Sequence, residues 1–256
     1  MVDARAVVEP GAKLAPGVSI GAYSIIGPQV EIGAGTWIGP HVVVTGRTHI
    51  GCNNRIFQFA SLGEEPQDKK YSGEDTLLTI GDRNVIREHC TMSRGTGQGG
   101  GITQVGNDNW IMAYVHIAHD CAVGHQTIFA NSASLAGHVT VGDYAILGGF
   151  TLVHQFCAIG AHSFCGMGSV ISKDIPPYTM VSGNMARAHG LNSEGLKRRG
   201  FSADTLRHLR EAYKILYKSK LTVVQALVRL KEMQHECSEV GVLVAFLERV
   251  TRGIVR

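Results

Sequence analysis

The chain has 256 residues, a formal net charge of +3 and 44% hydrophobic residues, enough for one large domain or two smaller ones. No apolar run approaches the roughly 18 residues of a membrane-spanning helix, and the first residues, MVDARAVVEPGAKL, contain no signal-peptide core. The 32 glycines and the low aromatic content indicate many tight turns and a core of small side chains.

A repeat with a period of six occupies most of the chain. An aliphatic residue recurs at every sixth position from Val8 to Leu62, and the phase resumes at Ile80 and again from Val105 to Ile171. A glycine often follows it directly. Period six is typical of a solenoid in which each hexapeptide forms one short strand and one corner. Three hexapeptides would close a triangular coil with a period of 18, whose backbone pairs with the coils above and below.

Two polar, glycine-bearing segments, 63–79 and 94–104, interrupt the repeat. We expect both to be loops ejected from a coil. They are either tolerated surface insertions or places where binding groups sit on a rigid scaffold.

After Pro176-Pro177 the repeat ends and a helical pattern begins. Ser202 is the expected N-cap of a helix over 203–219, and Thr222 that of a helix over 223–233. A third helix is expected over 240–252. The face of the first helix that we expect to be buried carries Leu206, Leu209, Tyr213 and Leu216. We therefore predict a β-solenoid over 1–185 and an α-helical domain over 186–256.

Charge divides along the same boundary. Residues 1–185 carry 10 basic and 14 acidic side chains, a net of −4, whereas residues 186–256 carry 14 and 7, a net of +7. A basic tail indicates an acidic partner or a phosphate group, although an ordinary solvated face has the same composition. Nucleic acid is weakly supported, because no aromatic residues are interleaved with the positive charges.

The cysteines contain no CxxC pair, so we expect reduced and mostly buried thiols in a cytoplasmic protein. Their positions are Cys52, Cys90, Cys121, Cys157, Cys165 and Cys237.

The stretch YVHIAHDCAVG, residues 114–124, places two histidines and an aspartate within five positions. Residues 18 apart stack in adjacent coils, about 4.8 Å apart as in any sheet. The pairs 119/120, 137/138 and 155/156 then line one edge of the prism. We expect this edge to gather four imidazoles: His116, His119, His138 and His154.

A general base is the function that such a cluster favours. His119 would take a proton from an attacking hydroxyl, and Asp120 would orient its ring, which requires a corner between the two residues. The backbone N–H of Gly137 would stabilise the oxyanion. The chain has no GxSxG elbow and no evidently activated cysteine, so direct transfer is favoured over a covalent intermediate. The alternative is a zinc site on His116 and His119, as in gamma-class carbonic anhydrases.

The hexapeptide pattern resembles that of the hexapeptide-repeat acyltransferases, which implies a left-handed parallel β-helix. The motifs YVHIAHDC, ANSASLAGHVTVGD, LVHQFCAIGAHSF and GLNSEGLKRRGFS more specifically resemble the UDP-N-acetylglucosamine O-acyltransferase family. The resemblance implies transfer of a 3-hydroxyacyl group from acyl carrier protein to the 3-hydroxyl of UDP-N-acetylglucosamine, the first step of lipid A synthesis. It also implies a homotrimer with active sites between neighbouring prisms, and a basic tail that receives the carrier protein. We expect no cofactor, no metal, no nucleic acid and no membrane insertion.

The same resemblance assigns roles to residues. It makes His119 the general base, Asp120 its orienting partner and Met167 the element that measures the acyl chain. Where the family has glycine at this position, long chains fit, so Met167 predicts a preference nearer ten carbons than fourteen. Ser93 replaces a histidine of the family. The residues that would contact substrate are Asp68, Lys70, His116, His138, His154 and Gln155, and, at the uridine diphosphate end, Asn192, Glu194, Arg198 and Arg199.

Four other functions stay open at this point. An N-acyltransferase later in the same pathway normally carries a further N-terminal domain, whereas the repeats here start by Val8. A coenzyme-A-dependent acetyltransferase, a structural solenoid and a zinc enzyme also have compatible sequences. A 3-amino sugar nucleotide as acceptor would turn the product into an amide.

Overall fold

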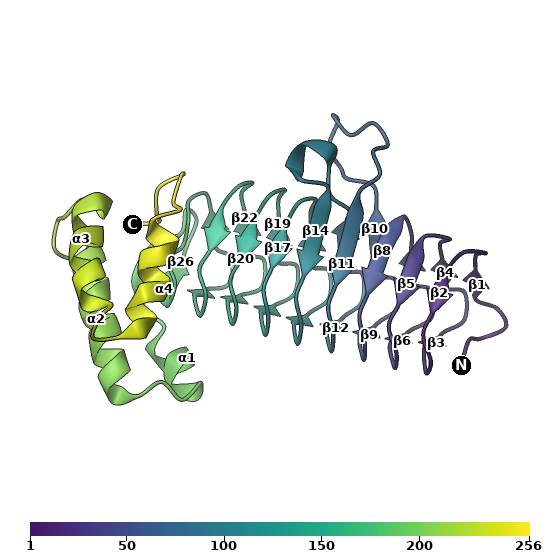
Figure 1. Cartoon of the computed structure of the whole chain (residues 1–256), viewed down its shortest axis with the longest axis horizontal. Coiled ribbons are helices and arrows are strands. Elements are labelled where there is room, and N and C mark those ends of the chain that lie inside the picture. Colours follow the sequence, from purple (N-terminus) through teal and green to yellow (C-terminus); the bar gives the residue numbers. More distant parts are fainter.

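The computed structural model describes residues 1–256 as an elongated prism with four helices packed at one end (Figure 1). The prism has three faces, each a sheet of short parallel strands. The first face contains, in order, β1 (Val7–Val8), β4 (Ile25–Ile26), β7 (Val43–Val44), β10 (Ser61–Glu64), β13 (Thr91–Ser93), β16 (His116–Ile117), β19 (Ser134–Leu135), β22 (Leu152–Val153) and β25 (Val170–Ile171).

The second face contains β2 (Lys13–Leu14), β5 (Val30–Ile32), β8 (Arg47–Ile50), β11 (Leu77–Ile80), β14 (Ile102–Val105), β17 (Ala122–Val123), β20 (Thr140–Val141) and β23 (Ala158–Ile159). The third contains β3 (Ser19–Ile20), β6 (Trp37–Ile38), β9 (Arg55–Ile56), β12 (Val85–Ile86), β15 (Trp110–Ile111), β18 (Ile128–Phe129), β21 (Ile146–Leu147), β24 (Phe164–Cys165) and β26 (Thr179–Ser182). It ends with the antiparallel strand β27 (Arg187–Leu191), beyond residue 185, where we expected the domain boundary.

The register confirms the predicted length of the coil. His116 pairs with Ser134, and Ser134 with Leu152, each partner 18 positions further along the chain. The chain turns between faces at corner residues in the left-handed region, for example Tyr114 (φ 65°), Asp120 (φ 58°) and Gln126 (φ 54°). Non-glycine residues seldom adopt this conformation. Its recurrence at every sixth position is what bends the backbone from one face to the next.

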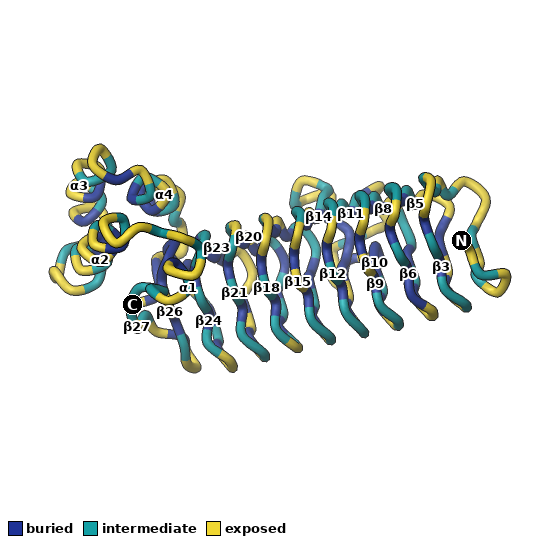
Figure 2. Tube along the Cα trace, turned by 90° about the horizontal axis from the view of Figure 1, so that it is seen from below, coloured by how far each residue is buried: buried dark blue, intermediate teal, exposed yellow.

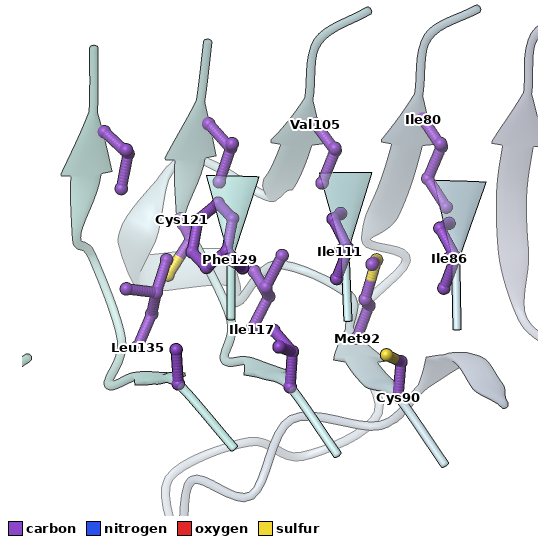
Figure 3. Packing of buried hydrophobic residues seen from close by; sticks show 14 of the residues in the cluster. Ile80, Ile86, Cys90, Met92, Val105, Ile111, Ile117, Cys121, Phe129 and Leu135 are labelled. Carbon is purple, nitrogen blue, oxygen red and sulfur yellow. The ribbon is translucent and has the colours of Figure 1, made fainter. Parts of the chain in front are cut away.

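The periodic aliphatic residues fill the interior of the prism. Ile86 and Ile111 point inward from the third face and Ile117 from the first, and all three are completely buried (Figure 3). From β3 to β26 every strand has at least one buried residue, and the residues beside it and at the corners are mostly partly or fully exposed (Figure 2). Each such side chain contributes about 1.5–3 kcal/mol relative to an exposed one. The repeat therefore supplies one continuous core, which holds the corners in fixed positions.

The two interruptions are shorter than the sequence predicted, because strands take up part of each segment. β10 continues to Glu64, β11 begins at Leu77 and β14 begins at Ile102, which leaves excursions over 65–76 and 94–101. Ser61 pairs with Thr91, 30 positions on, and Thr91 with His116, 25 positions on. Each excursion therefore lengthens its own coil beyond the usual spacing, and the strands still pair, with one register shift between Leu62 and Glu64. The second contains the short 3-10 helix η1 (Gly97–Gly99).

The C-terminal helices are α1 (Ser193–Arg198), α2 (Ala203–Tyr217), α3 (Val223–Met233) and α4 (Ser238–Leu247). Ser202 and Thr222 cap α2 and α3 as predicted, and Thr222 forms a capping box with Gln225. The third predicted helix is shorter than expected, because α4 ends at Leu247. Tyr213 lies at the margin of the buried face of α2, where Ala212 is fully buried instead.

The segment after α4 returns to the prism, where the Val255 N–H donates to the carbonyl of Asp174. None of the helices is both long and apolar enough to cross a bilayer. All six cysteines are free thiols, and Cys52 is the one that is not fully buried.

Candidate active site

His119 and Asp120 form a hydrogen-bonded pair at the edge between the first and second faces. His119 Nδ1 lies 2.7 Å from Asp120 Oδ2. The pair needs a corner, and the left-handed backbone of Asp120 provides it by turning both side chains to the same side. The Asp120 side chain is 1% exposed and the His119 ring 14% exposed. His119 Nε2 has no hydrogen-bond partner in the structure. Asp120 therefore holds Nδ1, while Nε2 is free to exchange a proton with a bound molecule.

The second excursion completes the surroundings of the Asp120 carboxylate. The Thr96 N–H donates to Oδ1 at 2.9 Å, and the Thr96 hydroxyl donates to Oδ2 at 2.7 Å. The backbone N–H of Asp120 donates to the Thr103 hydroxyl at 2.8 Å. These contacts leave the carboxylate little freedom to rotate. Thr96 was not predicted as a site residue, because it lies inside the excursion, where the spacing of 18 does not apply. Thr103 was not predicted either, although its strand β14 pairs with β17 at the usual spacing of 18.

Gly137 lies directly beside the His119 ring in the next coil. A Cβ on Gly137 would be 2.5 Å from His119 Cε1 and 2.7 Å from Nε2, so only glycine leaves room for this ring position. The Gly137 N–H donates no hydrogen bond in the structure. An unused donor next to an available imidazole nitrogen is suited to an oxyanion formed beside the base.

His138 follows on the same edge. Its Nε2 lies 3.7 Å from Asp120 Oδ2, and its ring meets the His119 ring edge-on with centroids 5.1 Å apart. On the other side it stacks on Phe156 at 4.4 Å, a residue that was placed on this edge but given no role. The column Asp120, His138 and Phe156 repeats the spacing of 18, which could have identified Phe156 as a platform.

His116 is near this cluster, but His154 is not in contact with it. His116 Nδ1 lies 2.7 Å from the Thr91 hydroxyl. Burial, and then the charge of His119, lower the pKa of His116. His154 is exposed further along the prism, where its Nδ1 lies 3.2 Å from the Gln155 carbonyl. That carbonyl also accepts from Arg252 Nη1. Of the four predicted imidazoles, the structure therefore brings three together.

A groove of about 660 Å³ starts at His138 and Phe156 and runs between the second face and α4. Its walls include Phe246 of α4, Arg249 just after that helix and the buried Asp174. Burial raises the pKa of the Asp174 carboxyl, although the Ala158 N–H donates to it. The groove connects the histidine cluster with the basic helical tail.

The other predicted residues lie away from His119 in the single chain. In the first excursion, the Lys70 N–H donates to Asp68 Oδ1 at 3.0 Å, and the Lys70 side chain is exposed. Met167 is 79% exposed at the edge between the third and first faces. Ser93, at the end of β13, is 5% exposed.

The segment 192–199 lies on the edge between the second and third faces, where Tyr144, His162 and Tyr178 stack. Asn192 caps α1 and donates to the His162 carbonyl, and Arg199 covers the Tyr144 ring at 4.4 Å. Burial, and then the charge of Arg199, lower the pKa of His162 to about 4.

Two further residues of this segment face solvent: Glu194 pairs with Lys197, and Arg198 is exposed. This segment and His119 thus occupy different edges of one prism.

His119, Asp120 and His138 could also hold a metal ion, because their ligand atoms lie within 4.8 Å of one another. The 2.7 Å between His119 Nδ1 and Asp120 Oδ2 is a hydrogen-bond distance. Two ligands of a tetrahedral zinc, each about 2.0–2.1 Å from the ion, would lie about 3.3 Å apart. Asp120 also already accepts two hydrogen bonds from Thr96. The arrangement fits an oriented imidazole better than a metal ion.

Comparison with known proteins gives consistent matches over the whole chain. Residues 174–255 match a family described as Udp N-acetylglucosamine O-acyltransferase, domain 2, and residues 102–137 match the bacterial transferase hexapeptide family. An acyl-[acyl-carrier-protein]–UDP-N-acetylglucosamine O-acyltransferase of Thiobacillus denitrificans is 62% identical over 255 residues, covering 100% of this chain and 99% of the relative. One of Stenotrophomonas maltophilia is 54% identical, covering 100% and 97%.

Solved structures agree with these matches. LpxA from Acinetobacter baumannii has a TM-score of 0.98 at 52% identity, and the UDP-N-acetylglucosamine O-acyltransferase from Moraxella catarrhalis a TM-score of 0.99 at 45% identity. Both cover 100% of this chain and 99% of the other. The left-handed parallel β-helix expected from the resemblance is thereby confirmed.

Proposed function

This chain belongs to the UDP-N-acetylglucosamine O-acyltransferase family, and from that premise we propose that it transfers a 3-hydroxyacyl group from acyl carrier protein to the 3-hydroxyl of UDP-N-acetylglucosamine. This reaction would be the first step of lipid A synthesis, and we place it in the cytoplasm, where six free thiols stay reduced. The observation that carries the chemistry is the His119–Asp120 pair beside the unused N–H of Gly137.

His119 acts as the general base in this proposal. Nε2 removes the proton of the sugar hydroxyl as its oxygen attacks the thioester carbonyl, while Asp120 Oδ2 holds Nδ1 and stabilises the imidazolium. The tetrahedral oxyanion accepts from the Gly137 N–H, a contact worth about 3 kcal/mol. Collapse re-forms the carbonyl and breaks the carbon–sulfur bond, and the leaving thiolate takes the proton from His119. No covalent acyl-enzyme is required, and the activated thioester supplies the driving force.

Binding of the sugar nucleotide requires groups from two edges of the prism. Asn192, Arg198 and Arg199 would hold the uridine diphosphate end, yet they are on a different edge from His119. A homotrimer resolves this separation if the segment 192–199 of one prism faces the histidine edge of its neighbour. Glu194 would join that segment. His116, His138, His154 and Gln155, with Asp68 and Lys70 from the first excursion, would meet the sugar and the reacting groups.

The acyl carrier protein would dock on the helical domain. The net charge of +7 over residues 186–256 attracts an acidic partner and speeds its encounter with the enzyme. The groove between α4 and the second face ends at His138, so it offers a route from the helices to the base.

Met167 would set the length of the acyl chain. Its exposed side chain projects from the prism edge and would narrow the groove between neighbouring prisms. Forcing a longer chain past it costs about 1–3 kcal/mol, and each excluded methylene forfeits about 0.8 kcal/mol of burial. We therefore expect carrier thioesters of about ten carbons to be preferred over those of fourteen. Met167→Gly should shift the preference to the longer thioester, whereas the volume-conserving Met167→Leu should not. An unchanged preference in Met167→Gly would contradict this role.

One experiment tests the reaction as a whole. The enzyme is given UDP-N-acetylglucosamine with a mixed pool of acyl carrier thioesters, and separately with acetyl-coenzyme A, and products are identified by mass spectrometry. We expect a 3-O-(3-hydroxyacyl) product from the carrier thioesters alone. His119→Ala should reduce turnover about 10²–10⁴-fold, the usual contribution of a general base. Near-wild-type turnover in that variant would exclude His119 as the base, and acetyl transfer from coenzyme A would overturn the proposed donor.

A further inference from the structure

The two excursions from the prism lie side by side and are connected by buried polar contacts (Figure 1). The connection passes through Arg94 and Thr96, which are 9% and 4% exposed. Neither residue is among the proposed catalytic or substrate-binding residues. A buried arginine is unusual, because removing its charge from water is costly unless strong hydrogen bonds replace the lost solvation.

Arg94 holds the first excursion. Its Nη1 donates to the Gly63 carbonyl, and its Nη2 donates to the Tyr71 hydroxyl at 3.0 Å. The guanidinium passes directly over Gly46, where a Cβ would lie 1.9 Å from Nη1. No carboxylate pairs with Arg94, so its hydrogen bonds all go to groups of the first excursion and its base. The absence of a side chain at Gly46 therefore leaves the space that the Arg94 guanidinium occupies.

Tyr71 transmits this contact to the proposed substrate residues. Its hydroxyl accepts from Arg94 and donates to the Glu74 carbonyl at 3.0 Å. The Tyr71 N–H donates to the carbonyl of Asp68, whose carboxylate accepts from the Lys70 N–H. The Tyr71 hydroxyl therefore ties the turn that carries Asp68 and Lys70 to Arg94, while Arg47 of β8 holds the far end of the excursion through Asp75.

Thr96 holds the other end of the connection. Its N–H and its hydroxyl both donate to Asp120, one to each carboxylate oxygen. The hydroxyl also accepts from the Gly99 N–H, and a Cβ on Gly99 would lie 2.1 Å from the Asp120 carboxylate carbon. Gly95, between Arg94 and Thr96, is equally constrained, since a Cβ there would lie 2.2 Å from the Ile102 nitrogen.

We propose that the buried segment 94–96 is a positioning element that couples the first excursion to the catalytic pair. Thr96 fixes the rotation of the Asp120 carboxylate and thereby the His119 ring, and Arg94 fixes the turn that carries Asp68 and Lys70. The inference rests on the proposed function. It adds that substrate binding and base orientation are set by one rigid connection rather than by two independent loops.

The two ends of this connection should affect different kinetic constants. Thr96→Val keeps the shape and the backbone N–H but removes the hydroxyl, so kcat should fall about 10- to 100-fold, the usual cost of losing an orienting contact behind a functional group. The KM for the sugar nucleotide should stay unchanged. Thr96→Ser retains the hydroxyl and should restore kcat. Equal losses in Thr96→Val and Thr96→Ser, or an unchanged kcat in Thr96→Val, would refute the orienting role.

Tyr71→Phe removes one hydroxyl from the other end. The KM for the sugar nucleotide should rise about 2- to 10-fold, the equivalent of one hydrogen bond. Tyr213→Phe is the matched control, because the Tyr213 hydroxyl makes no hydrogen bond in the structure. The double variant Tyr71→Phe/Thr96→Val tests the coupling. If the two ends are coupled, its fold-loss in kcat/KM should be smaller than the product of the fold-losses of the two single variants. Multiplicative losses would show two independent loops.

Hydrogen exchange separates this inference from the proposed reaction. In the full-length protein, Tyr71→Phe and Arg94→Lys should speed amide exchange over residues 65–76, whether or not any substrate is turned over. Unchanged exchange over 65–76 in both variants would overturn the coupling. A wild-type enzyme that makes no acylated sugar nucleotide would instead overturn the proposed function, and the exchange experiment would still decide the coupling.

Discussion

Gly137→Ala is the smallest change that should displace the proposed base. The new Cβ would lie 2.5 Å from His119 Cε1, whereas ordinary contacts begin at 3.4 Å, so ring and backbone must separate by about 0.9 Å. The ring cannot move freely, because its Nδ1 is held by an Asp120 carboxylate that Thr96 also fixes. Gly137 is not in the left-handed region, so alanine adds a steric clash without backbone strain. A misplacement of about 1 Å costs about 10²-fold in rate.

The assay compares kcat at saturating substrates with the melting temperature of each variant. We expect Gly137→Ala to lose about 10²-fold in kcat, less than or comparable to His119→Ala, since it keeps both the imidazole and the N–H donor. Gly241→Ala, where the nearest atom to the new Cβ is 3.7 Å away, is the control and should behave as wild type. If Gly137→Ala keeps kcat within about twofold of wild type, ring placement against Gly137 does not matter and the argument fails.

Three further outcomes follow from buried groups. Because the pKa of His162 is lowered to about 4, the unfolded chain binds more protons between about pH 6.5 and 4, so the free energy of unfolding should fall as pH drops through this range. His162→Phe keeps the stacked ring and should show a shallower fall in urea titrations; an identical slope would contradict the assignment. A maleimide should label Cys52 and spare Cys165 until unfolding, because burial raises the pKa of the Cys165 thiol to about 12. Asn84→Ala should lose about 2–4 kcal/mol in denaturant unfolding, since its amide donates to Asn54 and to a backbone carbonyl inside the prism; a loss below about 1 kcal/mol would show that water replaces it.

The sequence predicted the prism well, because one pattern determines it. Inward positions such as Ile86 and Ile117 must be apolar in every coil, so a period of six persists along the chain and reveals the larger period of 18. The stacking of Gly137 beside His119 followed from that arithmetic. The corner at Asp120 did not, because a left-handed conformation at a non-glycine residue leaves no mark in a single sequence.

The other contacts of the site could not be predicted, because they join residues whose separation in the sequence is not a multiple of the repeat. Thr96 contacts Asp120 although the two are 24 positions apart and not 18, because the residues of the second excursion add to the length of the coil. The helix α1 has only six residues, too few to show a helical period. Which edge carries Arg199 depends on how the chain leaves the prism after β27, where Phe201 packs edge-on against Tyr178 of the prism.

The fixed length of the coil also limits how a protein of this kind can gain or lose residues. A single hexapeptide added between His119 and Gly137 would rotate every later side chain a third of a turn about the long axis, and a different residue would then face His119. Both existing insertions bulge outward and return the chain to phase, since Thr91 and His116 rejoin the first face in register. Insertions and deletions that keep the reacting atoms in place are thus confined to outward bulges or whole coils.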